Sequence, residues 1–493
     1  MIGGLAEIAT GATLAGLGTV AGDITSSGTV SPGLDGTFGT MTVAGNYVAT
    51  NGAVHISSRL GDDASPTDRL IVSGDVSGTS TVKVTNLGGH GAETANGIRI
   101  IQVGGVSPGN AFVLSGDYTT EAGQQAVIGG VFAYTLQHGG MQTQGDGSWY
   151  LVSELAATNP DTGVIEEKPR YQPGMPLYEQ YPQVLASLNT VPTLQQRVGN
   201  RYWQPNAAGS SFGTYGMWGR IEGSRSESEA ARSTTLAHRS TDLWKLQTGF
   251  DFVLREGADG SLLVGGVNIS HSTALADIGS PYGRGKIDTT GTGIGATLTW
   301  YGANGFYVDT QAQAMFFDSD ITSTTIGRRE VKGNNGHGYA LSAETGFRYQ
   351  LGNGFSLTPQ MQLVWSRVDF DSFTDAYGAR VSLRNGDSLR GRLGLSLDYE
   401  KGWTAADGTK SRAHVYAIAN LYNEFLKGSK VSVENTSFRS RDERLWAGVG
   451  LGGTYEWNNG KYALYGNVNF AGSTRKMSDN HSFGGIIGFR ATW

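Results

Sequence analysis

Residues 389–400 read LRGRLGLSLDYE, and apolar and polar side chains alternate along this stretch almost without interruption. Leucine, glycine and tyrosine occupy the odd-numbered positions, while arginine, serine, aspartate and glutamate occupy most of the even-numbered ones. Successive side chains of a β-strand point to opposite faces of a sheet, so this period of two predicts a strand with one apolar and one polar face. A tilted strand of about 9 to 11 residues is long enough to cross a bilayer.

The same period recurs throughout the C-terminal half of the chain. The twelve strands that it predicts cover residues 213–224, 239–255, 262–273, 287–301, 306–318, 337–351, 355–369, 383–400, 411–426, 440–457, 461–472 and 481–493. They are longer than the five or six residues of a typical soluble strand. Aromatic residues gather toward their ends on the apolar face, as at the interfaces of an outer-membrane barrel, and an even number of strands is typical of bacterial barrels.

The connections between these strands differ in length in a regular way. Those after the second, fourth, sixth and tenth strands are short, those after odd-numbered strands are longer, and only residues 401–410 depart from the rule. Short turns lie on the periplasmic side of outer-membrane barrels and long loops lie outside. We therefore predict a 12-stranded transmembrane antiparallel β-barrel with the start of its first strand and Trp493 both on the periplasmic side.

Composition narrows the alternatives. The 493 residues include 75 glycines, no cysteine and only 16% charged residues, with a net charge of -6. The sequence has no run of about 18 apolar residues, which a membrane-spanning helix would need. A soluble β-sandwich is the weaker alternative, because it would leave the edges of long strands to protect. Residues 1–160 hold four basic and twelve acidic residues, so nucleic acid is not an expected partner.

The N-terminal part contains a loose repeat. Thr-Val-Ala-Gly-Asp ends at Asp23, Thr-Val-Ala-Gly-Asn at Asn46, Ile-Val-Ser-Gly-Asp at Asp75 and Val-Leu-Ser-Gly-Asp at Asp117. Short β segments with such recurring turns predict the end of a β-solenoid over residues 1–158, with a β-sandwich as the alternative. The first basic residue is Arg59, so the start is expected to be internal rather than a secretory signal.

A proline-rich linker separates the two parts. Six of the twelve prolines lie between residues 160 and 192, which predicts an extended polar segment. Farther on, Val184, Leu188, Val191, Leu194 and Val198 follow a helical spacing, interrupted by Pro192. At about 1.5 Å per residue, a helix of some 20 residues ending at Trp203 would span roughly 30 Å, the thickness of the bilayer core. We predict a pore helix within residues 159–203, with a surface helix that caps the stem as the alternative.

Several motifs make the resemblance to one family specific. They are GDDASPTDRLIVSGD (61–75), PTLQQRVGNRYW (192–203), LTPQMQLVWSR (357–367) and an alternating end at Trp493. In this order of regions, the chain resembles monomeric (classical, type V) autotransporters with a pertactin-like passenger stem and a C-terminal translocator barrel, here residues 204–493. The resemblance implies an all-β fold with an autochaperone-like stem. It also implies an outer-membrane translocator that exports and displays its own N-terminal passenger at the cell surface.

The resemblance extends to partners. It implies a monomer in outer-membrane lipid that depends on periplasmic chaperones and on the barrel assembly machinery. In such proteins that machinery recognises the C-terminal strand, and the residues matching the signal here are Ile487, Phe489 and Trp493. Some family members release their passenger by cyclisation of an asparagine that is paired with a second asparagine inside the pore helix. Asn189 and Asn200 stand alone, so this cleavage is not expected.

The polar face of the predicted strands supplies the candidate site. We expect it to line the lumen through Arg220, Glu222, Lys245, Asp251, Glu344, Arg348, Arg390, Arg392, Asp398 and Arg490. Unpaired charges in a narrow pore are costly. Pairing with Gln195, Gln196, Arg197 and Arg201 of the helix is therefore expected.

No catalytic, cofactor-binding or metal site is predicted, and the chain is not expected to be an enzyme. Gly386-Asp387-Ser388-Leu389 matches the nucleophile block of a lipase family, but it begins a barrel strand rather than a strand-to-helix turn. Asp62, Asp63 and Asp68 fit a turn better than a calcium site. The competing functions are an outer-membrane hydrolase with a site among the loops and a passive porin.

Overall fold

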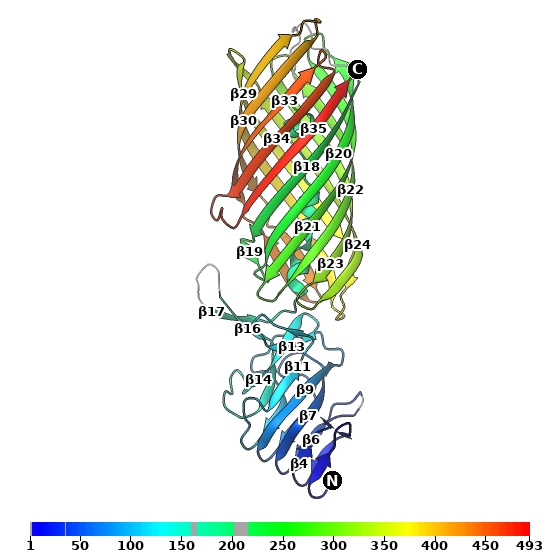
Figure 1. Cartoon of the computed structure of the whole chain (residues 1–493), viewed down its shortest axis with the longest axis vertical. Helices are drawn as coiled ribbons and strands as arrows, with labels where there is room; N and C mark the ends of the chain where they lie inside the picture. The colour runs from blue at the N-terminus through cyan, green and yellow to red at the C-terminus, as the bar shows by residue number, and fades with distance from the viewer. Residues whose placement is uncertain (1, 35, 159–164, 202–214) are drawn as a thin grey trace.

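The computed structural model describes residues 2–34, 36–158, 165–201 and 215–493. A long barrel and a slender N-terminal stem lie end to end, and nearly every element is a strand (Figure 1). Among the described residues, no helix is both long and apolar enough to cross a membrane.

The barrel confirms the predicted twelve-stranded architecture. Each strand pairs antiparallel with its neighbours, and β24 pairs with β26 while β25 (Tyr349–Gly352) continues β24. The twelve spanning strands are β18 (Tyr215–Glu229), β20 (His238–Glu256), β21 (Leu262–Ser280), β22 (Gly283–Tyr301), β23 (Phe306–Ser323), β24 (Arg328–Phe347), β26 (Phe355–Phe370), β29 (Asp387–Thr404), β30 (Lys410–Glu424), β33 (Leu445–Trp457), β34 (Tyr462–Ser473) and β35 (His481–Thr492).

The first and last strands close the barrel. Strands β18 and β35 are in register from Gly216 opposite Thr492 to Glu227 opposite His481. The backbones of Tyr215 and Trp493 then exchange two further hydrogen bonds. Closure leaves no barrel edge with unpaired backbone groups, which a bilayer does not tolerate.

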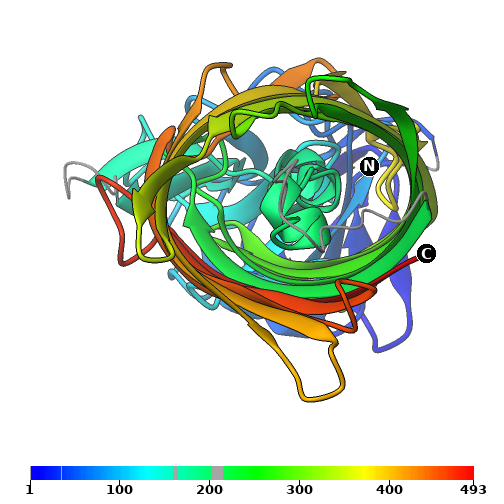
Figure 2. The ribbon, with the colours of Figure 1, turned by 90° about the horizontal axis from the view of Figure 1, so that it is seen from above.

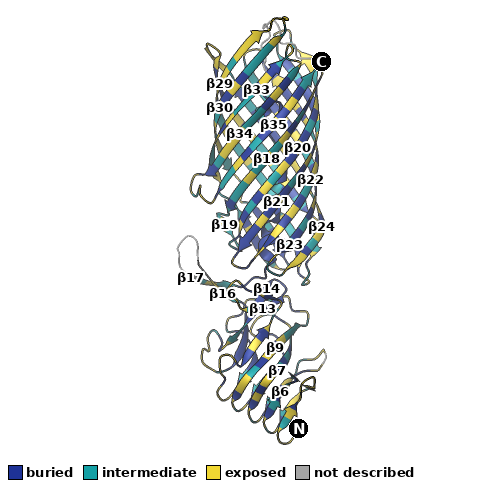
Figure 3. Cartoon of the chain, in the orientation of Figure 1, coloured by how far each residue is buried: buried dark blue, intermediate teal, exposed yellow. Residues whose placement is uncertain are grey.

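The wall of the barrel is apolar outside and polar inside, as the sequence period predicts. In β29, Leu393 and Leu395 are 58% and 48% exposed, whereas Arg392 and Ser396 are 5% and 0% exposed. Figure 3 shows the resulting stripes of exposed and buried residues along the strands. The exposed leucines face the position of the lipid.

One predicted connection is wrong in length. Strand β29 runs to Thr404 and β30 begins at Lys410, so the turn is residues 405–409 and is as short as the others at that end. Asp407 accepts hydrogen bonds from the backbone and hydroxyl of Thr409, just as Asp259 does from Ser261. Both turns read Ala-Asp-Gly followed by a hydroxyl residue, so the apparent exception had a sequence signal.

The stem is the predicted solenoid end rather than a sandwich. Parallel pairs stack β3 on β6, β8 and β10 in one sheet, and β1 on β4, β7, β9 and β11 in another. These strands are β1 (Ala6–Ile8), β2 (Thr13–Ala15), β3 (Gly18–Val20), β4 (Ile24–Ser26), β5 (Thr29–Ser31), β6 (Thr40–Val43), β7 (Tyr47–Ser58), β8 (Arg69–Val72), β9 (Val76–Asn86), β10 (Ile98–Val103) and β11 (Phe112–Ser115). The antiparallel strands β12 (Tyr118–Thr119), β13 (Gln125–Gly129), β14 (Phe132–His138) and β15 (Trp149–Val152) terminate the stack.

A ladder of side chains explains the sequence repeat. The Asp23 carboxylate accepts the Asn46 N–H at 2.7 Å, the Asn46 amide oxygen accepts the Asp75 N–H at 2.9 Å, and Asp75 accepts the Val106 N–H at 2.8 Å. A glycine precedes each upper member because a Cβ at Gly45 would lie 2.0 Å from the Asp23 oxygen.

The fourth repeat is not part of this ladder. Asp117 instead accepts the Ile128 N–H within the terminal hairpins. Gly105 and Val106 take the fourth place in the stack, above Gly74 and Asp75. Val106 has no carboxylate to extend the ladder, so the repeat ends here without a recognisable sequence motif.

The linker is more structured than an extended polar segment. Strands β16 (Glu154–Thr158) and β17 (Ile165–Pro169) form a hairpin, and α1 (Met175–Leu188) and α2 (Leu194–Val198) follow. Pro192 lies between the helices, and Thr193 caps α2. Figure 2 shows α1 inside the barrel, so the alternative of a surface helix is wrong. Trp203, where the predicted helix ends, lies outside the described residues.

A second, smaller sheet covers the stem-side mouth of the barrel, and the sequence did not predict it. We call it the cap sheet. Its strands are β19 (Arg232–Ser233), β27 (Phe373–Thr374), β28 (Arg380–Asn385), β31 (Ser429–Val433) and β32 (Thr436–Arg441). They come from three barrel loops. The predicted strands 383–400 and 440–457 each merged the end of a cap strand with a barrel strand.

Candidate functional site

The candidate site is the barrel lumen together with the linker that passes through it. Helix α1 packs against β20 to β23 and β26 on one wall and against β31 and β32 of the cap sheet. Its apolar side chains, such as Leu177 and Leu185, join a buried cluster with Ile278, Ile287 and Phe317 of that wall. The lumen wall is therefore apolar where α1 lies, although the sequence predicted a wholly polar lumen.

Polar side chains of α1 are held by the cap sheet and its flanks. Glu179 is fully buried and accepts the Thr235 N–H at 3.0 Å and the Ser233 hydroxyl at 2.5 Å. Gln180 accepts a hydrogen bond from Arg239 at 2.6 Å and donates one to Ser440 at 3.0 Å. Tyr178 and Gln183 add hydrogen bonds to Asp375 and Ser429, so α1 is held from several sides of the helix.

The C-terminal end of α1 meets a buried lysine. Lys245 Nζ donates to the carbonyl oxygens of Thr190 at 3.1 Å and Leu188 at 3.5 Å. A cation at this end satisfies free carbonyls and complements the helix dipole. Asn189 is held there as well, since its amide donates to the backbone of Tyr339 and accepts from Gln313.

Farther along, α2 is surrounded by buried ion pairs, which we call the ion-pair belt. Arg197 pairs with Asp309 at 2.5 Å, and Arg201 pairs with Asp251. Arg490 donates to the carbonyl of Val198 at 2.8 Å. These contacts join the linker to strands that lie more than 100 residues away in two of the three cases.

The remaining members of the belt connect barrel strands. Glu344 accepts the Leu194 N–H at 3.2 Å, at the start of α2, and pairs with Arg392 at 3.5 Å. Arg490 also pairs with Glu456 at 2.5 Å, and Arg412 bridges Glu456 to Glu400. The carboxylates therefore balance the arginines that the linker and the wall bring into the lumen.

All ten residues predicted to line the pore lie on the inner side of the wall. Four of them contact the linker, namely Lys245, Asp251, Glu344 and Arg490, and Arg392 lines the cavity beside it. The others pair along the wall: Arg220 with Glu222, Arg348 with Glu400, and Asp398 with Thr358 and His414. The guanidinium of Arg390 lies 5.5 Å from the Tyr422 ring.

Of the linker residues, Arg201 makes an expected pair, with Asp251, whereas Arg197 pairs with Asp309, which was not among the predicted residues. Gln196 closes the capping box of α2 with Thr193, and Gln195 lines the small cavities beside α2. Asp309, Glu400 and Glu456 were not among the residues predicted to line the pore. Asp309 could have been found, because it occupies the polar phase of its strand between Val308 and Thr310.

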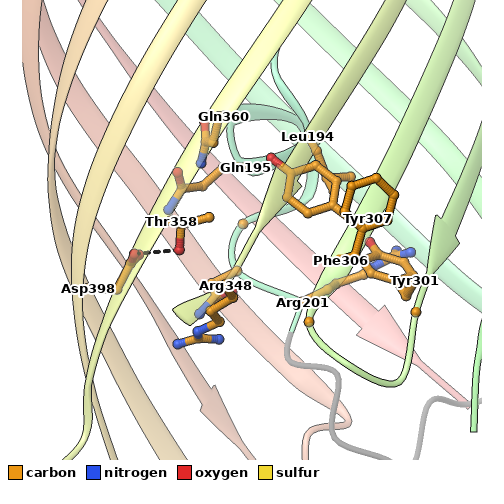
Figure 4. Close-up of a pocket in the computed structure, with 14 residues that line it drawn as sticks. Leu194, Gln195, Arg201, Tyr301, Phe306, Tyr307, Arg348, Thr358, Gln360 and Asp398 are labelled. Atoms are coloured by element: carbon orange, nitrogen blue, oxygen red, sulfur yellow. Dashed lines mark hydrogen bonds between the residues drawn. The ribbon is translucent and has the colours of Figure 1, made fainter. Parts of the chain in front are cut away.

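The linker fills only part of the lumen. A polar side chamber of about 440 Å³ lies beside α1, toward Arg390, Glu424 and Trp446 of β29, β30 and β33. A smaller cavity of about 90 Å³ lies beside α2, and its lining includes Arg201, Arg348 and Asp398 (Figure 4). The lumen therefore keeps space for water next to a helix that is anchored at both ends.

Two further predictions concern residues other than the ten lining positions. Ile487, Phe489 and Trp493 are 57%, 44% and 56% exposed on the outer face of the last strand and the chain end. Ser388 lies at the side chamber, where its hydroxyl donates to Glu424 at 2.6 Å, so its partner is a carboxylate rather than a histidine.

The aspartates of the stem turn do not converge on one point. Asp63 accepts the backbone N–H groups of Ala95, Asn96 and Gly97, and Asp68 accepts those of Gly39 and Ser57. Within the described ranges, no group of three or more histidine, cysteine or acidic residues could hold a metal ion.

A closed barrel with an apolar exterior, threaded by the segment that links it to a solenoid, defines a membrane-embedded translocator with its passenger attached. Comparison with known proteins agrees with this class. Residues 217–469 match the autotransporter beta-domain, and residues 19–136 match the Autochaperone Domain Type 1. The chain belongs to the autotransporter family.

Individual relatives share this architecture. The chain is 46% identical over 479 residues to the adhesin BmaC autotransporter of Brucella suis biovar 1, covering 95% of this chain but 14% of that protein. It is 27% identical over 412 residues to the autotransporter adhesin AIDA-I of Escherichia coli, covering 80% of this chain and 30% of the relative. The solved transport unit of AIDA-I has the same fold, with a TM-score of 0.52 at 17% identity over 66% of this chain and all of that structure.

Family and fold together identify the chain as an autotransporter barrel of the bacterial outer membrane that carries a solenoid stem. The chain spans less than a third of the length of these two relatives.

Proposed function

We propose that residues 204–493 export residues 1–158 through their own lumen and that the helical part of the linker 159–203 then remains in the pore as the tether. The path of the chain is the observation that carries this proposal. The stem lies at the end of the barrel opposite Trp493, and α1 and α2 lie in the lumen between the two (Figures 1 and 2). The ten lining residues named above form the polar surface over which the passenger would pass.

The absence of cysteine from the sequence allows a direct test of this topology. Single cysteines are introduced at Val113 in the stem, Met477 in the loop between β34 and β35, and Ala406 in the turn between β29 and β30, all of which are exposed. The chain is expressed behind a secretory signal, and intact cells are treated with a membrane-impermeant maleimide.

We expect labelling of Val113→Cys and Met477→Cys on intact cells, and of Ala406→Cys only after the outer membrane is permeabilised. The cysteine-free chain is the matched control for background labelling. If Met477→Cys is labelled but Val113→Cys is not, the barrel has inserted and the passenger has not been exported, which would refute the proposal.

The passive-porin alternative predicts a different conductance. A lumen blocked at the ion-pair belt should conduct poorly in a planar bilayer, whereas a barrel lacking residues 1–203 should hold water throughout. We expect the shortened barrel to conduct on the order of tenfold more. Equal conductance would mean that the linker does not obstruct the pore, and the porin reading would then be favoured.

We infer that the passenger acts by binding rather than by catalysis. Two relatives are named adhesins, although the more distant relative EspP of Escherichia coli O157:H7 is named a serine protease. Cells displaying the chain should hydrolyse short-chain esters no faster than cells without it, and Ser388→Ala should change nothing. Ester hydrolysis that disappears in Ser388→Ala would restore the hydrolase alternative.

We further propose that the barrel assembly machinery and periplasmic chaperones deliver this chain as a monomer. The outward side chains of Ile487, Phe489 and Trp493 support this, because they give the last strand an apolar face beside the backbone edge that later pairs with β18. Cross-linking of the unfolded chain to the assembly machinery, with and without Trp493, tests the proposal.

A further inference from the structure

A groove runs across the outer wall of the barrel. It crosses β26, β29, β30, β33, β34 and β35, has a volume of about 540 Å³ and is lined mainly by apolar side chains. Ala419 of β30 forms part of its floor, because this small exposed residue pairs with Leu395 of β29 on one side and Val449 of β33 on the other. Both larger side chains are exposed. The lipid-facing wall is therefore not smooth, and the groove has room for a narrow apolar chain.

The groove runs obliquely through the thickness of the membrane. One end is Leu357, two residues into β26 at the end of the barrel that carries Trp493, and the other is Phe483, two residues into β35 at the stem-side end. Six neighbouring strands, at about 4.8 Å per spacing, make the groove roughly 24 Å long. Because barrel strands tilt by about 35–45°, roughly 15 Å of this length lies along the membrane normal, which is half of the hydrocarbon core. The groove therefore has the depth of one leaflet.

Three barrel loops meet just beyond the stem-side end of the groove. The Arg444 guanidinium, between β32 and β33, donates to the carbonyl of Leu426 between β30 and β31 at 3.2 Å. The Thr474 N–H, between β34 and β35, donates to the carbonyl of Leu445 at 3.0 Å. In Figure 1 the loop between β34 and β35 projects from the side of the wall, away from the stem-side ends of β21 and β23. On this side of the barrel the loops therefore lie next to the apolar band.

These loops carry three exposed cations, Lys427, Arg444 and Arg475, which we call the basic rim. In the part of the chain that the structure describes, none of the three forms an ion pair with a carboxylate. Another exposed cation at this end of the barrel is neutralised by its neighbour, since Lys286 of β22 pairs with Asp277 at 3.2 Å. The basic rim is therefore open to an anion from outside the chain.

The acidic residues of the same loops do not cancel this charge. Asp442 pairs with an arginine of β20 at 2.9 Å, and Lys476 pairs with a glutamate of β18 at 3.7 Å. Glu443 and Asp479 are the other acidic residues of these loops, so the three cations of the rim outnumber them. The stem-side end of the groove therefore carries a net positive charge.

An apolar groove of leaflet depth below a basic rim is complementary to a lipid with an anionic head. Phosphate oxygens accept strong, charge-assisted hydrogen bonds from lysine and arginine. The surrounding lipid is as apolar as the groove, so packing of an acyl chain supplies van der Waals contacts and position rather than a hydrophobic driving force. Selectivity must then come from the head group, and a zwitterionic head would bring its own cation to the rim.

We propose that the groove and the basic rim bind one phosphorylated glycolipid of the outer leaflet. An acyl chain lies over Ala419, and the phosphates lie at Lys427, Arg444 and Arg475. The inference rests on the proposed function in one respect, since the stem-side mouth must face outward. A lipid that binds only the folded barrel also stabilises it, so the site would secure the side of the wall that ends closest to the groove.

The test uses the purified full chain in phosphatidylcholine nanodiscs, to which lipid A with two phosphates is added. Native mass spectrometry counts the lipids that stay bound, and a titration gives the dissociation constant. Lys427→Gln/Arg475→Gln removes two cations of the rim, and Ala419→Phe fills the groove while keeping the wall apolar. Only chains with a folded barrel, recognised by heat-modifiable migration, are counted.

Matched controls place the same changes elsewhere. Lys332→Gln/Arg380→Gln removes two exposed cations of β24 and the cap sheet, at the same end of the barrel. Ala296→Phe enlarges an exposed alanine of β22, which lies outside the groove. Lipid A without phosphates and phosphatidylglycerol are the matched lipids.

We expect one lipid A per chain, and a dissociation constant that rises at least about tenfold in each test variant and stays unchanged in both controls. Lipid A without phosphates should also bind at least about tenfold more weakly. Unchanged binding in the two test variants would overturn the site, and equally tight binding of phosphatidylglycerol would overturn its assignment to a glycolipid. A dimer of the chain that disappears in Ala419→Phe would make the groove an interface between copies and would also overturn the proposal. An inverted barrel would instead appear in the cysteine labelling and leave binding to the purified chain intact, so the two failures are distinguishable.

Discussion

The stem and the barrel are both built from strands, but they distribute apolar residues in opposite ways. In β7 of the stem, Val54 and Ile56 point inward and are 0% exposed. In β29 of the barrel, Leu395 and Leu397 point outward and are 48% and 47% exposed. A period of two therefore does not by itself say which face is buried. The length of the strands and the charge on the polar face decide it.

The two regions also differ in how their strands are connected in space. Stem strands stack in a line, so each rung depends mainly on its neighbours. Barrel strands form a cycle that β18 and β35 must close. Damage to one barrel strand should therefore affect the whole domain, whereas damage to an outer rung should remain local.

The largest effect should come from removing the end of the cycle. Deleting Trp493 removes the backbone pair with Tyr215 and an aromatic side chain at the interface, and we expect the yield of folded barrel to fall on the order of tenfold. Deleting residues 1–20 at the outer end of the stem should leave the remaining rungs protease-resistant. Heat-modifiable migration and external proteolysis measure both results. Trp493→Phe is the control for aromatic character, and a normal yield after the deletion would contradict the closure argument.

A lysine placed on the apolar face of a strand should distinguish the stem from the barrel. Val54→Lys places an unpaired ammonium group in the apolar stem interior and should cost more than about 4 kcal/mol, which unfolds the rungs around β7. Leu395→Lys on the outer face of the barrel should cost about 2–4 kcal/mol, since the lipid-facing lysine can reach toward an interface. Urea titration of each domain, followed by proteolysis, measures the difference. Equal costs would mean that Leu395 does not face lipid.

The next variants concern the polar interior of the barrel, where ion pairs hold the linker. Arg197→Ala removes the cation that pairs with the buried Asp309, which keeps only its hydrogen bonds from Thr299 and Gln311, and should destabilise the docking of α2 in the lumen by about 3–5 kcal/mol. The double variant Arg197→Ala/Asp309→Ala should recover much of that loss. Protease access to the linker from the periplasmic side measures the release. A double variant no better than the single one would show that the pair is not coupled.

Two glycines give the smallest contrast. Gly45→Ala should destabilise the stem by about 1–3 kcal/mol, because its Cβ would overlap the Asp23 carboxylate in the ladder. Gly223→Ala in β18 should change barrel stability by less than about 1 kcal/mol, because its Cβ meets open space. The urea midpoint of each domain is the measurement, and an unaffected Gly45→Ala stem would remove the ladder as the reason for the repeat.

Much of this architecture was predictable, because lipid and lumen impose opposite demands on successive residues. Arg392 and Asp398 lie at even positions and Leu393 and Leu397 at odd ones, and this alternation correctly predicted which face of the strand points to the lumen. The cap sheet was not predicted, since its strands have two to six residues and carry no sustained period. Such short strands depend on neighbours from other loops rather than on their own sequence.

The site was predictable as a set of charges but not as a set of pairs. Lumen-facing charges follow from strand phase, yet Arg197 and Asp309 are 112 residues apart in sequence, and periodicity carries no information about partners at that distance. The apolar wall under α1 was missed for a related reason. Ala274, Ala276 and Ile278 lie beyond the predicted end of their strand, where the lumen contacts a helix rather than water.

The linker is attached to the barrel at two separate places. A segment attached at one point can pivot when its free end is pushed, whereas a segment attached at two separated points resists tilting. Here the cap sheet holds α1 at the stem-side mouth, and the ion-pair belt holds α2 deeper in the barrel. Sideways drag on the stem would enter at Tyr171, whose ring packs against Tyr282 and Phe438 of the barrel loops, and spread through these loops into the hydrogen-bonded wall. The passenger would then stand upright in flowing liquid without a covalent link to any barrel loop.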